Sequence, residues 1–274
     1  MCGRYASSKD PQSLVAEYDA VELAGEVLGA DYNVAPTKDV YAVIERLPRR
    51  RDEPAEPEVA QRKLKVVRWG LVPSWAKDPS IGNRMINARA ETLAEKPAFK
   101  RAFAKRRCIL PADGFYEWYT PEEPGAPRTK AGRPVKQPYF IHDPSGASLP
   151  MAGLYELWRD PAKDDDDPAA WLWTATVITT TATDELGRIH DRAPMLVEPD
   201  ARDRWLDPGL TDTDELTGLL VPAAPGRLVA RPVSTAVNDV RNNGPELVEP
   251  LPLDEVVAPG APAGDAQLSF GDDA

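Results

Sequence analysis

Short segments rich in β-branched and aromatic residues recur along this chain, and they constrain its fold more than any other feature. Loops rich in Pro, Gly and Asp separate them, as is typical of strands joined by turns. The segments predicted as strands are residues 1–5, 40–47, 66–71, 107–110, 115–119, 139–142, 151–158, 171–180, 195–197 and 228–233. The sequence therefore predicts a fold in which β-sheet dominates.

Two short helices are predicted beside the strands. Pro11 follows an aspartate, which is typical of a helix start. Pro97 can occupy the first turn of a second helix, in which Phe99 and Phe103 share a face. From Ala258 onward there are too few large apolar groups to offset the entropy of ordering, so we predict one domain over residues 1–257 and a disordered acidic tail over 258–274.

The net charge of −11 argues against a nucleic-acid partner, but the charge is unevenly distributed. Residues 1–159 carry 25 Lys and Arg against 21 Asp and Glu, whereas residues 160–274 carry 8 against 23. Eight basic side chains fall within residues 84–107, with two acidic ones. A local positive patch can therefore exist on an acidic protein.

Two cysteines are too few for a disulfide framework or a four-cysteine zinc site, and neither His142 nor His190 lies in a metal-binding spacing. We expect no metal and no cofactor. No apolar stretch approaches the roughly 20 residues of a membrane-spanning helix, and the first residues lack the pattern of a secretory signal. We therefore expect no membrane contact and a cytoplasmic location, with association to the nucleoid when the protein acts on DNA.

Cys2 occupies an unusual position, because removal of Met1 gives this one residue both a thiol and a free α-amine. An α-amine has a pKa of about 7.7 to 8.0, so part of it is neutral near pH 7 and can attack an aldehyde. The thiol can then close a five-membered thiazolidine ring. Burial of a small side chain at the start of a strand is the alternative interpretation.

The opening Met-Cys-Gly also resembles the start of glutamine amidotransferases with an N-terminal cysteine nucleophile. In that chemistry the thiolate attacks an amide carbonyl and the α-amine is the general base. This rival hypothesis shares only the first three residues with the chain.

Several longer segments, taken together and in order, carry a more extensive resemblance. They lie at residues 1–5, 32–37, 68–75, 86–92, 108–118, 152–156 and 189–192. Together they closely resemble the SRAP family, the SOS-response-associated peptidases or abasic-site processing proteins. The resemblance implies the SRAP fold, an α+β single domain with barrel-like antiparallel sheets and peripheral short helices.

The resemblance also implies catalytic roles for four residues. Cys2 matches the nucleophile that bonds to DNA, and Glu117 matches an acidic residue that handles protons as the abasic sugar opens to its aldehyde. Such a carboxyl works best if burial raises its pKa toward the operating pH. His190 matches a histidine that assists at the abasic site. Asn87 matches an asparagine that orients the sugar or the Cys2 amine.

A second set of residues is expected to contact DNA. Arg4 and Arg89 are predicted phosphate contacts, although a surface ion pair is the alternative for either. Asn33 lies in a family motif without a separate physical argument. Three tryptophans are predicted platforms for base stacking, with core packing as the alternative for each: Trp69, Trp75 and Trp118.

We therefore expect a protein that senses abasic sites in single-stranded DNA and forms a covalent thiazolidine crosslink through Cys2, shielding the lesion during replication or the SOS response. Removal of Met1 by the same site and strand cleavage by lyase chemistry are further expected activities. A single-strand binding module without chemistry is the remaining alternative. We expect a monomer, with the replication machinery as a possible partner.

Overall fold

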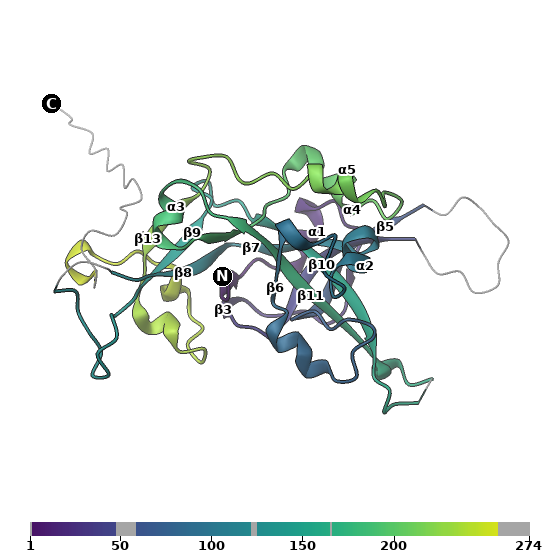
Figure 1. The fold of residues 1–274 in the computed structure, drawn as a ribbon, viewed down its shortest axis with the longest axis horizontal. Helices are drawn as coiled ribbons and strands as arrows, with labels where there is room; N and C mark the ends of the chain where they lie inside the picture. Colours follow the sequence, from purple (N-terminus) through teal and green to yellow (C-terminus); the bar gives the residue numbers. More distant parts are fainter. Residues whose placement is uncertain (1, 48–58, 122–124, 165, 257–274) are drawn as a thin grey trace.

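The computed structural model describes residues 2–47, 59–121, 125–164 and 166–256. The described part contains two β-sheets and five short α-helices (Figure 1). The prediction of a strand-rich α+β fold is confirmed. The predicted loop at 49–58 and the predicted tail at 258–274 lie outside the described residues.

The smaller sheet has five strands. In spatial order they are β13 (Val229–Pro232), β9 (Gln137–His142), β8 (Gly114–Tyr119), β1 (Tyr5–Ser7) and β3 (Asp31–Val34). β1 is antiparallel to both of its neighbours, with Tyr5 opposite Val34 on one side and Phe115 on the other. The residues that precede β1 therefore enter at the middle of the sheet rather than at an edge.

The larger sheet closes on itself. Its order is β12 (Arg192–Pro194), β11 (Trp171–Thr181), β10 (Leu149–Arg159), β7 (Arg107–Ala112), β4 (Asp39–Arg46), β5 (Gln61–Trp69) and β2 (Leu23–Ala24). β6 (Asn87–Arg89) pairs with β11, and β5 also pairs with β11. That last pairing joins the two ends of the run β11–β10–β7–β4–β5, so these five strands form a closed barrel.

The prediction of antiparallel sheets does not hold for every strand pair. β5 and β6 run parallel to β11, and β2 runs parallel to β5. Barrel closure pairs β5 and β11, which are far apart in sequence and run in the same direction. The antiparallel prediction holds for the remaining pairings between named strands.

The barrel strands separate two apolar cores. Successive side chains of a strand point to opposite faces, so Ala42 and Ile44 of β4 fill the barrel while Tyr41 and Val43 pack outside it. Helices cover that outer face through Leu14, Phe103, Trp205 and Leu216. These helices are α1 (Pro11–Glu17), α2 (Lys100–Lys105), α4 (Arg202–Leu206) and α5 (Thr213–Gly218); α3 (Asp184–Ile189) contacts β8 instead.

The predicted elements between residues 107 and 181 agree with the structure to within about two residues at most ends, whereas several others are wrong at their ends. The first strand begins at Tyr5 rather than ending there. The helix expected from Pro97 begins at Lys100, after a turn. The strand expected at 195–197 is displaced to β12, and Leu196 makes only an isolated bridge to Met151.

The strand predicted at 66–71 begins at Gln61 and stops at Trp69 because Gly70 adopts φ +123°. A Cβ on Gly70 would lie 2.6 Å from the Gly82 carbonyl oxygen, and a Cβ on Gly82 would lie 2.5 Å from the Gly70 oxygen. Both positions therefore need glycine, because their backbones touch. This contact fastens the 70–85 segment to the end of the barrel.

None of the helices in the described ranges has the length and apolar character needed to cross a membrane.

Candidate active site

Cys2 is fully buried at one end of the barrel core, beside Tyr5 and Trp69. Its carbonyl oxygen accepts a hydrogen bond of 2.7 Å from the Asn87 Nδ2. Burial raises the pKa of the Cys2 thiol well above its ordinary value, and the nearby Glu117 carboxylate adds to the shift. The thiol is therefore neutral near pH 7 while it lies buried.

Glu117 lies on β8 and is only 3% exposed. Burial is the main cause that raises its pKa to about 7, and the negative charge of Asp191 acts in the same direction. A carboxyl with this pKa exists in both protonation states near neutrality. It can therefore give and take a proton at physiological pH, as the sequence-based hypothesis requires.

His190 follows the last residue of α3, close to β8. Its Nδ1 accepts a 3.1 Å hydrogen bond from the Arg192 backbone N–H and lies 2.9 Å from the Asp191 Oδ1. Burial lowers the pKa of His190, although Asp191 opposes this. The lowered pKa favours the neutral ring, in which one nitrogen donates a proton and the other accepts one.

Asn87 and Arg89 lie two residues apart on β6, so they share one face of the strand. β6 is held by parallel pairing to β11, with Asn87 opposite Val177 and Arg89 opposite Thr179. The Asn87 Oδ1 is buried and accepts no hydrogen bond from the described residues, whereas the Nδ2 donates to the Cys2 carbonyl oxygen. Arg89 is exposed. β6 therefore presents an unused acceptor beside Cys2 and a cation at the surface.

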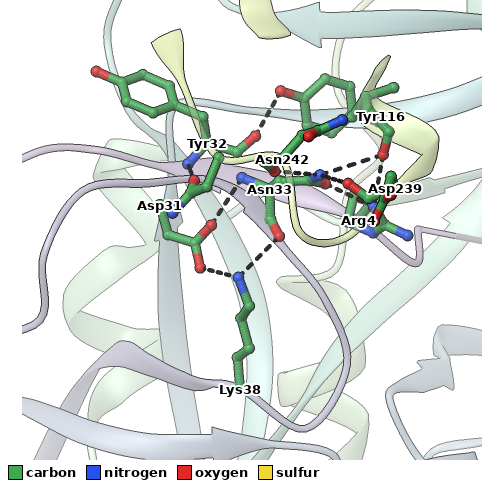
Figure 2. Close-up of polar contacts among 10 residues, drawn as sticks. Arg4, Asp31, Tyr32, Asn33, Lys38, Tyr116, Asp239 and Asn242 are labelled. Carbon is green, nitrogen blue, oxygen red and sulfur yellow. Dashed lines mark hydrogen bonds and ion pairs between the residues drawn. The ribbon is translucent and has the colours of Figure 1, made fainter. Parts of the chain in front are cut away.

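Arg4 is held by a network centred on Asn33 (Figure 2). The Arg4 Nη1 donates to the Asn33 Oδ1 at 2.7 Å and to the Val237 carbonyl at 2.9 Å. The Asn33 Nδ2 donates to the carbonyls of Val237, Asp239 and Asn242. Asn33 is fully buried, and its side chain positions Arg4.

The three predicted stacking residues have different environments. Trp69 is fully buried, donates from Nε1 to the Ile86 carbonyl, and meets the Tyr5 ring edge-on at 5.1 Å. It has no ring face for a base, so the stacking prediction does not fit it. Trp75 is 61% exposed. Trp118 is partly exposed, with the Arg4 guanidinium 5.9 Å from its ring centroid.

The structure therefore gathers Cys2, Asn87, Glu117 and His190 at one end of the barrel. Two further charges there were given no role from the sequence: Asp191, although it lies in the 189–192 segment, and Lys136, which lies in none of the segments that carry the resemblance. Asp191 and Lys136 each act electrostatically on both Glu117 and His190. In the described ranges, no three His, Cys, Asp or Glu side chains are grouped so that they could hold a metal ion.

Comparison with known proteins identifies the relatives of this chain. The family model for the SOS response associated peptidase (SRAP) matches residues 1–240. The abasic site processing protein YoqW of Bacillus subtilis is 37% identical over 250 residues, which cover 91% of this chain and 99% of YoqW. The abasic site processing protein HMCES of Gallus gallus is 33% identical over 245 residues, covering 81% of this chain and 66% of HMCES.

The fold also matches solved structures. A protein from Bacteroides thetaiotaomicron superposes with a TM-score of 0.69 at 23% identity, covering 91% of this chain and 100% of its own. One from Bordetella bronchiseptica gives 0.60 at 27% identity, covering 85% and 100%. The match to the family model and the identity to YoqW, over nearly the whole of both chains, place this chain in the SRAP family.

Proposed function

We propose that this protein processes abasic sites in single-stranded DNA by forming a covalent bond between the open sugar and Cys2. The names of YoqW and HMCES support the substrate class. The observation that carries the chemistry is the grouping of Cys2 with Asn87 and with a buried carboxyl whose pKa is about 7.

The first step is opening of the abasic deoxyribose. A protonated Glu117 donates to the ring oxygen as the anomeric hydroxyl loses its proton, which releases the aldehyde without net loss or gain of atoms. Removal of Met1 frees the Cys2 amine. The buried Asn87 Oδ1 accepts an N–H of that amine and directs its lone pair toward the aldehyde carbon.

The amine then adds to the aldehyde and water leaves, giving an imine. The thiol then closes the ring: its sulfur bonds to the imine carbon and its proton goes to the imine nitrogen, so the step balances. The amidotransferase alternative shares only the first three residues with the chain, whereas the SRAP family model matches residues 1–240. His190 exchanges protons with the sugar hydroxyls and water.

Surface features support the expected DNA contacts. Arg89 lies on the same strand face as Asn87 and can reach a phosphate, while the exposed ring of Trp75 can stack on a base. A missing base lowers the cost of drawing a nucleotide out of a strand, which favours the lesion over intact DNA. Shielding of the lesion during replication follows if the adduct is stable.

The decisive test is incubation of Met1-free protein with single-stranded DNA that contains one abasic site. We expect an adduct that survives denaturing electrophoresis. Cys2→Ala should abolish it, whereas Cys2→Ser keeps the amine and should give at most a transient imine with strand cleavage. A stable adduct with Cys2→Ala, or none with the authentic Met1-free protein, would overturn the proposal.

Intact mass spectrometry of the N-terminus separates the remaining alternatives. Retained Met1 blocks the amine and favours the binding module. If Met1 is lost in a strain that lacks methionine aminopeptidase, and retained there in Glu117→Gln, the site removes its own methionine.

A further inference from the structure

The barrel end remote from Cys2 carries inward-facing cations. On β5, alternate residues share a face. Val67 and Trp69 belong to the barrel core, so Lys65 and Lys63 continue on the same face toward the other end. At about 3.3 Å per residue, Lys65 lies roughly 13 Å from Trp69 along the strand. This second end is thus separate from the Cys2 cluster.

Lys65 and Arg46, which lies at the end of β4, are both close to one aromatic ring. The Lys65 Nζ is 4.6 Å from the Trp173 ring centroid, and the Arg46 Cζ is 5.1 Å from it. The Tyr155 ring stacks on Trp173 at 5.8 Å with an interplanar angle of 17°, which fixes the ring in place. Trp173 therefore holds two like charges close together.

Within the described ranges, neither Arg46 nor Lys65 forms an ion pair with a carboxylate, whereas Lys63 pairs with Glu22. Burial lowers the pKa of Lys65, and the charges of Arg46 and Lys63 lower it further. Bringing Arg46 and Lys65 together without a carboxylate to neutralise them costs free energy. An anion from solution would remove that cost.

These side chains line a pocket of about 360 Å³. Its other walls are mainly apolar, formed by Ala24, Ile44, Leu47 and the Trp173 ring. The volume lies in the range of about 300 to 1,000 Å³ that is typical of small-molecule sites. A basic corner and an apolar wall together fit a ligand with a compact anionic group on a flat, weakly polar body.

We propose that this pocket is a second binding site, which takes the phosphate of a nucleotide on Arg46, Lys63 and Lys65 and the base against the apolar wall. Arg46 offers a fork of donors to phosphate oxygens, and the lysines add point charges. The nucleotide is either free or the end of a DNA strand. The proposal does not depend on the chemistry at Cys2.

Equilibrium titration of the full-length protein with dAMP tests the site. We expect saturable binding that Arg46→Gln/Lys65→Gln weakens at least tenfold, because the double variant loses both charge-assisted contacts to the phosphate. Lys63→Gln, at the rim, should weaken binding less and provides a second variant if the double variant does not fold. No binding by wild type at millimolar dAMP, or equal binding by the variants, overturns the proposal.

A 5′-phosphorylated single-stranded oligonucleotide distinguishes the two sources. If it displaces dAMP and binds less tightly to the double variant, the ligand is a strand end. If it leaves dAMP bound, the ligand is a free nucleotide. Crosslinking to abasic DNA is measured separately on both proteins, so loss of that activity in wild type contradicts the proposed function and not this site.

Discussion

The two ends of the five-stranded barrel differ in how deeply they bury their charged side chains. At the Cys2 end, Glu117 is buried and its pKa rises to about 7, which makes it a proton carrier. At the other end, Arg46 and Lys65 stay partly exposed beside Trp173. One scaffold thus buries a carboxyl almost completely at one end and leaves two cations only partly buried at the other. The following predictions test that contrast.

The largest expected effect is on the rate of adduct formation in Glu117→Gln. Loss of a general acid typically costs a factor of about 10² to 10⁴. As pH rises through about 7 the wild type loses the proton donor while the neutral fraction of the Cys2 amine grows, so its profile should turn over; the variant should show only the rise from the amine. Single-turnover crosslinking between pH 5.5 and 8.5 measures both. A wild-type profile without a transition near 7 contradicts the role of Glu117 as acid.

Glu117→Gln should also change stability: although the variant reacts more slowly, it should be more stable than wild type at high pH. The folded-state pKa is raised from 4.5, so the folded protein binds more protons than the unfolded chain between pH 4.5 and 7. The contribution of Glu117 to stability is therefore full below pH 4.5 and is lost as pH rises through 7. At pH 8 the variant should be more stable than wild type by about 3 kcal/mol. Urea unfolding at pH 4.5 and 8 gives the difference; equal values at both pH values would contradict it.

Asn33→Ala tests how much the polar network around Asn33 stabilises the fold. The change removes one acceptor of Arg4 and the donor that bonds the carbonyls of Val237, Asp239 and Asn242, so we expect a loss of about 2 to 3 kcal/mol in unfolding free energy. Arg46→Gln at the opposite end is the matched variant and should cost less than about 1 kcal/mol. Similar losses for both would remove the contrast.

The smallest effect is expected for Arg89→Ala. If Arg89 contacts one phosphate, the slope of log affinity against log salt should decrease by about 0.7 for single-stranded DNA. Arg204→Ala is the control, because Arg204 lies on α4 and pairs with Glu215. Fluorescence anisotropy over a salt series measures the slopes. An unchanged slope for Arg89→Ala removes its phosphate contact.

The sequence predicts the strand-rich class and most long strands because β-branched runs and turn residues are local signals. It does not predict β6, whose three residues gain their hydrogen bonds from β11, about 90 positions away. Barrel closure through β5 and β11 is equally non-local. The ends of β5 depend on the backbone of Gly70, which composition alone does not reveal.

At the candidate site, motif resemblance names the residues but not their environments. Trp69 and Trp75 lie six positions apart in one motif, yet one is fully buried and the other 61% exposed. Asn33 is a predicted DNA contact, and its buried side chain holds Arg4. These differences depend on which face of an element meets the core, which the motif itself does not encode.

The touching backbones of Gly70 and Gly82 limit how this protein can vary. A Cβ added at either glycine would lie against the main chain of the other. A substitution at one position therefore cannot be rescued by a smaller residue at its partner. Both positions must therefore be glycine for this contact to form. The exposed Trp75 between them takes no part in this contact, so a change at Trp75 leaves the junction between the segment and the barrel intact.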